Sequence, residues 1–232
     1  CDVIITMVGF PEDVEAIYLD RNGIIPNSRP GLTFIDMTTS EPDLAVRIAS
    51  AAAEYGAEAL DAPVSGGDRG AREASLSIMV GGDQATFERI LPILKTMGKN
   101  IVYQGSAGSG QHCKLCNQIA IASNMLGVCE AMAYARRAGL KPETVLQSIA
   151  SGAAGSWSLS NLAPRMLAGD FKPGFYVKHF IKDMTLATRA AKAMDLDAPG
   201  LRLALERYLA LAEKGHGEDG TQALFRLYRK QD

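Results

Sequence analysis

The sequence changes its pattern at residues 105–118, which read GSAGSGQHCKLCNQ. The glycines allow a loop that approaches other groups closely, and the residues that follow place apolar side chains at helical spacing without proline. This spacing predicts one long helix over about residues 109–138, roughly 45 Å long at ~1.5 Å per residue. The helix would connect two parts of the chain that differ in pattern.

Before this stretch, segments typical of strands and of helices alternate. Such alternation predicts an α/β layer with a largely parallel sheet, half of a doubly wound fold. We expect Ser40 to be the N-cap and Pro42 to lie in the first turn of the second helix. The expected strands are 3–8, 33–37, 57–60, 76–80 and 101–103, and the expected helices are 11–19, 41–55 and 83–97.

After residue 110 the strand signal ends, and helical patterns follow one another. Apolar residues nearly encircle the long helix, which indicates burial by other helices or by a second subunit. We therefore predict two domains, 1–108 and 109–232, and a homodimer or homotetramer formed through the helical domain. The helical patterns are interrupted at Gly139, Gly155, Gly169, Pro173, Pro199 and Gly217.

Composition excludes several classes of protein. The formal net charge is −2 and the basic residues are scattered, so we expect no nucleic-acid partner. No apolar run approaches the ~20 residues that cross a bilayer, so we expect no membrane partner. Four cysteines do not make a disulfide framework, which favours a reducing, cytoplasmic location.

A metal site is also disfavoured. His112, Cys113, Cys116 and Cys129 are the residue types that bind zinc. One helix would hold all four, and it would separate Cys116 from Cys129 by ~20 Å at ~1.5 Å per residue. We therefore predict no metal.

Two polar loops follow expected strands, at the edge where open α/β sheets bind ligands. The first is residues 36–40. The second is residues 61–67, in which Ser65, Gly66 and Gly67 offer a hydroxyl and backbone N–H groups to an anion such as a carboxylate. An ordinary glycine-rich loop is the alternative interpretation.

Lys114 stands near the start of the long helix. Gln118 lies four residues later on the same helical face, and Asn117 lies three residues later and close to it. A lysine on a mainly apolar helix beside a glycine-rich cleft is a candidate for proton transfer. The alternative is a surface lysine whose stem lies along the helix.

Taken together, three motifs resemble the β-hydroxyacid dehydrogenase family, which includes 3-hydroxyisobutyrate dehydrogenase and tartronate semialdehyde (2-hydroxy-3-oxopropionate) reductase. The resemblance extends over all 232 residues. It implies a Rossmann-like domain joined by a long helix to an all-helical domain, and hydride transfer between NAD or NADP and a small 3-hydroxy acid or its semialdehyde. The motifs are residues 61–67, Gly108-Ser-Gly110 with Lys114 and Asn117, and Phe175 with Lys182-Asp183-Met184.

The resemblance also implies roles for individual residues. Lys114 would exchange a proton with the substrate oxygen. Ser65, Gly66 and Gly67 would hold the substrate carboxylate, and an amide from Asn117 or Gln118 would orient the substrate. The cofactor would contact Met7, Val8, Thr39, Phe175 and Lys182. For Lys182, a solvated charge paired with Asp183 is the alternative.

The sequence departs from the family pattern in two ways. Many members carry asparagine four residues after the lysine, where this chain has Gln118. The family's opening strand, its G-x-G-x-x-G turn and the residue that selects NAD or NADP do not occur. We therefore expect the chain to be the C-terminal part of the family's fold, truncated by about two βα units, and to bind cofactor poorly and be inactive alone.

Two other functions compete with this interpretation. One is a non-catalytic, oligomerising member of the same family, against which the presence of Lys114 argues. The other is 6-phosphogluconate dehydrogenase, which needs clustered basic residues and a longer helical domain, neither of which this sequence has.

Segments 171–175 and 181–184 resemble those of tartronate semialdehyde reductases slightly more than those of 3-hydroxyisobutyrate dehydrogenases. We expect Trp157 to be a core or subunit anchor, with a place at the border of the substrate cleft as the alternative. We expect His112, His179 and His216 to be structural.

Overall fold

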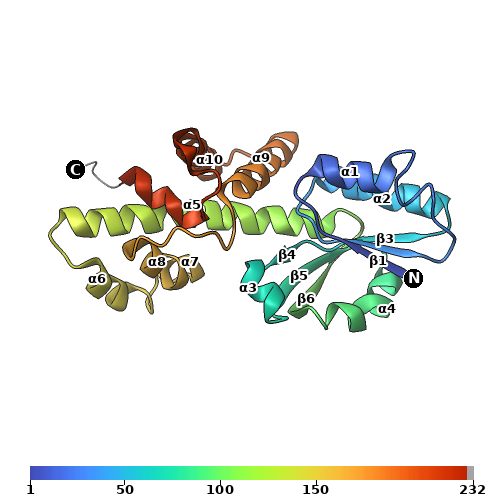
Figure 1. Ribbon diagram of the computed structural model, residues 1–232, viewed down its shortest axis with the longest axis horizontal. Coiled ribbons are helices and arrows are strands. Elements are labelled where there is room, and N and C mark those ends of the chain that lie inside the picture. The colour runs from blue at the N-terminus through green and yellow to red at the C-terminus, as the bar shows by residue number, and fades with distance from the viewer. Residues whose placement is uncertain (229–232) are drawn as a thin grey trace. The chain divides into compact units, whose positions relative to one another are not determined.

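The computed structural model describes residues 1–228 and shows the chain as two compact units, Cys1–Cys116 and Asn117–Asp232 (Figure 1). The long helix α5, Ser109–Arg137, begins in the first unit and continues in the second. Its bounds confirm the helix predicted over about 109–138. Among the described helices, none combines the length and the apolar character needed to cross a membrane.

The first unit is an α/β layer. Within the described residues its strands form one six-stranded sheet in the order β1-β2-β3-β5-β4, with β6 paired to β5. The pairs β1–β2, β2–β3 and β5–β6 are parallel, and β5 is antiparallel to β3 and β4. The elements are β1 Val3–Thr6, α1 Pro11–Leu19, β2 Thr33–Asp36, α2 Pro42–Glu54, β3 Glu58–Asp61, β4 Val64–Ser65, α3 Gly67–Arg72, β5 Leu76–Gly81, α4 Gln84–Leu94 and β6 Gly98–Gly105.

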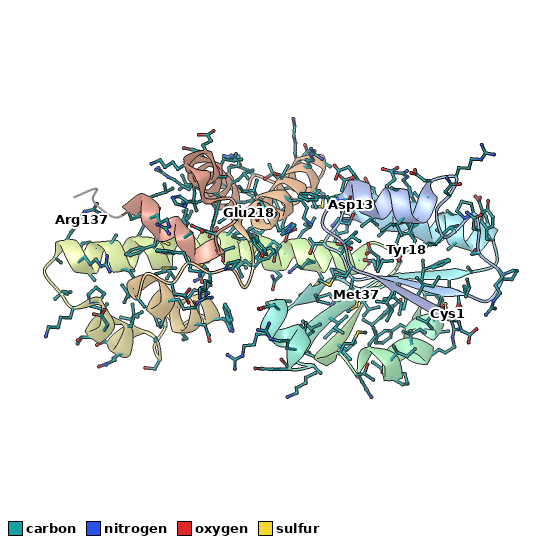
Figure 2. All side chains as sticks on the ribbon, viewed as in Figure 1. Cys1, Asp13, Tyr18, Met37, Arg137 and Glu218 are labelled. Atoms are coloured by element: carbon teal, nitrogen blue, oxygen red, sulfur yellow. The ribbon has the colours of Figure 1, made fainter. Side chains whose placement is uncertain are left out.

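The sheet is covered on both faces, as its continuous apolar strands require. Helices α1 and α2 lie over one face and α4 over the other (Figure 1). Along β2, Phe34 packs with α1 and α2, whereas Ile35 packs with α4. Because side chains alternate along a strand, one buried strand serves two cores. Tyr18 of α1, labelled in Figure 2, stacks edge-on against Phe34 with ring centroids 5.8 Å apart.

Two local predictions in this unit are wrong. The N-cap of α2 is Glu41, not Ser40, and Ser40 instead donates its backbone N–H to the Gln111 side chain. Residues 65–67 are not a continuous loop, because Ser65 ends the short strand β4 and Gly67 begins α3. Antiparallel pairing of Ser65 with Ser77 of β5 creates this strand. A strand of two residues is too short to produce a recognisable pattern in the sequence.

The second unit is mostly helical. Besides most of α5 it contains α6 Pro142–Ile149, α7 Trp157–Asn161, α8 Ala163–Leu167, α9 Val177–Ala193, α10 Pro199–Leu211, a π-helical turn Ala212–His216 and a 3-10 helix Thr221–Tyr228. Proline occupies the first turn of α6 and α10, where its missing N–H costs nothing.

Two further side chains of this unit, Arg136 and Trp157, lie near helix ends. Arg136, near the end of α5, lies 5.0 Å from the ring centroid of Phe225, so this cation is placed by packing. Trp157 is 66% exposed at the start of α7, which rules out the predicted core position, whereas its role as a subunit anchor stays a prediction. The start of α7 is stabilised by its N-cap, because Ser156 Oγ accepts the N–H of Leu159. Burial of Trp157 is therefore not needed to fix this helix start.

Candidate active site

Three polar residues end the parallel strands at one edge of the sheet. Thr6, Asp36 and Asp61 are register partners on β1, β2 and β3. The Thr6 hydroxyl donates to Asp36 Oδ1 at 3.1 Å and lies 2.7 Å from the hydroxyl of Tyr18. Burial raises the pKa of the Asp36 carboxyl, and hydrogen bonds from Thr38 and Thr6 oppose that shift. This edge therefore places two buried carboxylates on adjacent strands.

Gln111 joins the loops that follow β1 and β2 to helix α5. Its side chain is fully buried. Its Nε2 donates to the carbonyl of Thr38 at 2.7 Å, and its Oε1 accepts the N–H of Ser40 at 2.9 Å. The hydroxyl of Thr38 in turn accepts the N–H of Val8 at 2.9 Å. The segments carrying Val8 and Thr39 are thus held to the start of α5 by side-chain hydrogen bonds.

Asp61 holds the same helix start from the end of β3. Its Oδ1 accepts the N–H of Gly108 at 2.8 Å, and its Oδ2 accepts the N–H of Gln111 at 2.8 Å. Burial raises the pKa of this carboxyl, and these two N–H groups, with that of Gly110, oppose the shift. Sequence reasoning assigned no role to Asp61 or Gln111. A charged residue at the end of a buried strand was the available signal for Asp61.

Lys114 follows Gln111 by one turn of α5 and is 7% exposed. A surface lysine is therefore excluded for this position, although its chemical role stays a prediction. In the same unit, Ser65 is half-buried, and Gly66 and Gly67 are exposed with φ of +134° and +62°. Glycine is needed there because side chains rarely adopt such angles. A Cβ on Gly66 would also lie 3.2 Å from Leu76.

The remaining predicted residues lie in the second unit. Gln118 Nε2 donates to Asp183 Oδ2 at 2.6 Å, and Asn117 Nδ2 donates to Gln118 Oε1 at 2.6 Å. Lys182 Nζ lies 2.9 Å from Asp183 Oδ1, with the two side chains 11% and 2% exposed. The alternative of a solvated Lys182 is therefore wrong, while its pairing with Asp183 is confirmed. Asp183 connects Lys182 with the amides and had been assigned no role.

Phe175 and His179 lie near the start of α9. The ring of Phe175 packs against Phe180 with centroids 5.6 Å apart, and its backbone carbonyl accepts the N–H of Thr221 at 3.0 Å. His179 lies edge-on to Tyr176. Burial, and then the nearby Lys182, lower the pKa of His179. These contacts agree with a structural role for His179.

The end of β1 places one exposed apolar side chain beside half-buried neighbours. Met7 is 65% exposed just beyond the strand, beside half-buried Val8 and Thr39. Exposed apolar side chains next to backbone and hydroxyl groups are typical of sites for flat, partly polar ligands. The carboxyl ends of parallel strands are also where open α/β sheets bind such cofactors.

Two families of known proteins match the chain. Residues 1–105 match the family described as the NAD binding domain of 6-phosphogluconate dehydrogenase. Residues 108–228 match the family described as NAD-binding of NADP-dependent 3-hydroxyisobutyrate dehydrogenase. The first match covers a cofactor domain alone, so the exclusion of 6-phosphogluconate dehydrogenase activity stays a prediction. Both matches support NAD or NADP as the cofactor.

Individual relatives are similar over nearly the whole chain. An uncharacterized oxidoreductase of Bacillus subtilis, YkwC, is 61% identical over 229 residues, covering 99% of this chain and 80% of the relative. The 2-hydroxy-3-oxopropionate reductase of Escherichia coli is 41% identical over 223 residues, covering 96% of this chain and 76% of the enzyme.

A solved structure of Mycobacterium tuberculosis 3-hydroxyisobutyrate dehydrogenase with L-serine has a similar fold. It is 33% identical, with a TM-score of 0.89, and the match covers 98% of this chain and 79% of that one. The predicted architecture, a largely parallel α/β sheet followed by a long helix and a mostly helical part, is thereby confirmed.

Proposed function

Since the chain belongs to the β-hydroxyacid dehydrogenase family, we propose that it transfers hydride between NAD or NADP and a small 3-hydroxy acid or the corresponding semialdehyde. The main support is Lys114, a buried lysine whose helix start is held at the ligand-binding edge of the sheet by Asp61 and Gln111. Burying an ammonium is costly, so a lysine as buried as Lys114 needs interactions or a chemical task that offset this cost.

In this proposal Lys114 carries the proton of the reaction. When the semialdehyde is reduced, its Nζ gives a proton to the carbonyl oxygen, and in the reverse direction it takes the hydroxyl proton. The nicotinamide ring supplies or accepts the hydride when bound. A proton donor fixed near the substrate oxygen is effective because little reorganisation is needed at the moment of transfer.

The substrate carboxylate would bind at Ser65, Gly66 and Gly67. The exposed backbone of the two glycines offers N–H groups at close range, since no side chain stands in the way. Ser65 adds a hydroxyl from the end of β4. Binding the carboxylate fixes one end of the substrate, so that carbon 3 can be presented to Lys114.

The two amides would divide one task. Gln118 is fully buried and donates to Asp183, so its side chain is committed to the protein. Asn117 is half-buried and donates to Gln118 Oε1. We therefore assign contact with the substrate to Asn117 and the orientation of Asn117 to Gln118. This division explains how glutamine can follow the lysine by four residues.

Cofactor contacts are proposed for five residues. Met7, Val8 and Thr39 follow the ends of β1 and β2, where the exposed Met7 would cover the nicotinamide ring. Phe175 and Lys182 would contribute from α9 and the segment before it. An ammonium such as that of Lys182 is suited to a phosphate or carboxamide oxygen. A homodimer or homotetramer and a cytoplasmic location also remain proposals.

The named relatives narrow the choice of substrates for testing. One relative acts on 2-hydroxy-3-oxopropionate, and the solved neighbour was studied with L-serine. Both compounds carry a carboxylate at carbon 1 and a reacting oxygen at carbon 3. Tartronate semialdehyde, methylmalonate semialdehyde and L-serine therefore form the first substrate panel.

The test measures oxidation of NADH and NADPH by the full-length protein with each semialdehyde, and the reverse reaction with L-serine. We expect turnover with at least one pair. Lys114→Ala should lower kcat by orders of magnitude while retaining cofactor binding. Lys99→Ala, which changes an exposed lysine on β6, is the matched control and should keep full activity. Cofactor binding without turnover on any substrate would contradict the proposal and favour a non-catalytic member of the family.

A further inference from the structure

Asp61 is less exposed to solvent than any of the predicted site residues in the first unit. It is 4% exposed and lies at the end of β3. Each carboxylate oxygen accepts a backbone N–H from a segment that is 47 or 50 residues distant in the sequence, Gly108 and Gln111. The first N–H groups of a helix have no partner within that helix. Asp61 therefore caps α5 from another part of the fold.

The surrounding backbone is shaped to let this carboxylate in. A Cβ on Gly81 would lie 2.5 Å from Asp61 Oδ1, and a Cβ on Gly110 would lie 2.8 Å from Asp61 Oδ2. The latter would also lie 2.4 Å from the carbonyl oxygen of Met79. Real Cβ atoms do not approach other atoms so closely. The ends of β3 and β5 and the start of α5 thus meet around one carboxylate, with glycine on two sides.

This position connects two parts of the proposed active site. From Asp61 the chain reaches Ser65 within four residues, and from Gln111 the helix reaches Lys114 within three. Resting on the function proposed above, we propose that Asp61 is a positioning residue, which fixes the start of α5 and thereby holds Lys114 in register with the carboxylate-binding residues Ser65, Gly66 and Gly67.

The chemistry of the cap requires a carboxylate. Two N–H donors approach different oxygens, and only a carboxylate presents two acceptors. In Asp61→Asn one N–H would face an amide NH₂ group, so one of the two bonds would be lost. Asp36 is the matched control because it is a buried register partner of Asp61. The Thr6 hydroxyl and the backbone N–H of Thr38 both donate to Oδ1 of Asp36, where the oxygen of an asparagine can accept them.

Hydrogen exchange tests the cap without any assay of activity. In the wild-type protein the amides of Gly108 and Gln111 should exchange slowly, although amides in the first turn of a helix ordinarily exchange fast. Asp61→Asn should accelerate exchange across residues 105–114, and Asp36→Asn should leave it unchanged. Fast exchange of both amides in the wild type would overturn the inference even if the variant failed to fold.

Kinetics then separates positioning from general stability. We expect Asp61→Asn to bind cofactor at an unchanged number of sites per chain, measured by fluorescence titration. Its kcat per bound cofactor should fall about 10- to 100-fold, the loss that a displacement near 1 Å produces. The isotope effect with 4-deuterated cofactor should rise as chemistry becomes rate-limiting. A purely structural role would reduce the number of sites and leave the isotope effect unchanged.

The possible outcomes distinguish the two proposals. If the wild-type protein turns over and Asp61→Asn retains the same kcat per site and isotope effect, Asp61 does not position the reaction, while the proposed function stands. If the wild-type protein binds cofactor but turns over no substrate, the proposed function and this role for Asp61 both fail. Slow exchange at Gly108 and Gln111 would then identify a structural cap alone.

Discussion

Two glycines of α5 provide a sharp test of how tightly the sheet edge is packed. A methyl group at position 110 would lie 2.4 Å from the carbonyl oxygen of Met79 and 2.7 Å from that of Asp61. Both atoms belong to backbone and cannot rotate away. At position 127, in the same helix, a Cβ would meet nothing within 4 Å. Gly110→Ala and Gly127→Ala should therefore have opposite effects on stability.

The magnitudes follow from two contributions. Overpacking a tight site costs about 1–3 kcal/mol, and exchanging glycine for alanine within a helix returns at most about 1 kcal/mol. We expect Gly110→Ala to lower the free energy of unfolding by about 1–2 kcal/mol. Gly127 is exposed and has no positive φ, so Gly127→Ala should raise the free energy by about 0.5–1 kcal/mol.

Urea unfolding followed by hydrogen exchange of separate peptides is the appropriate assay, because the chain is divided into two compact units whose stabilities can differ. Gly110→Ala should lower the midpoint for peptides of residues 1–116, and Gly127→Ala should raise it for peptides from the second unit. Wild-type stability in Gly110→Ala would refute the close approach of β3, β5 and α5, and with it the cap at Asp61. A destabilised Gly127→Ala would show that α5 is covered at that position.

Three further predictions concern titratable side chains that are buried or half-buried. Asp36→Asn should stabilise the protein at pH 7, because the raised pKa of Asp36 makes its ionised form costly in the folded state. This advantage should be lost as the pH falls from 7 to about 4, the pKa of an unfolded aspartate. Urea midpoints measured against pH check this, and an unchanged difference between pH 4 and 7 would contradict it. Asp183→Ala should lower the free energy of unfolding by about 3 kcal/mol, since it removes the carboxylate that contacts Lys182 and Gln118. An unaltered urea midpoint for the second unit would contradict a stabilising role for these contacts. In an NMR titration His179 should show a midpoint below 6.5, because burial disfavours its charged form. Its contribution to stability should be lost as the pH falls from about 6.5 towards that midpoint. A midpoint at or above 6.5 would contradict the effect of burial on this imidazole.

Periodicity was sufficient to predict most of the fold. The helix at Pro11–Leu19 and the long helix α5 follow from apolar spacing and from the placement of proline and glycine. The parallel sheet follows from alternation of strand and helix. Strand β6, however, spans Gly98–Gly105, longer than the predicted 101–103, because pairing with β5 extends it through polar residues. Such pairing depends on a neighbour that the local sequence does not reveal.

The candidate site was predictable where a motif was present and hidden where contacts are distant. Lys114 and the residues around Ser65 stood in recognisable patterns, whereas Gln111 looked like any polar residue near a helix start. Its importance lies in bonds to Ser40 and Thr38, which are 71 and 73 residues distant. No local propensity encodes such a pairing, so only the folded chain shows it.

The two buried carboxylates at the sheet edge are similarly buried but differ in the hydrogen bonds that they accept. Asp36 and Asp61 are 6% and 4% exposed, and burial raises the pKa of both. Each ionised form therefore lowers stability at neutral pH, so neither charge is explained by stability alone. At Asp36 the Thr6 hydroxyl and the Thr38 N–H both donate to Oδ1, whereas at Asp61 two backbone N–H groups donate to different oxygens. The geometry at Asp61 therefore requires a carboxylate, and that residue holds the helix that carries Lys114.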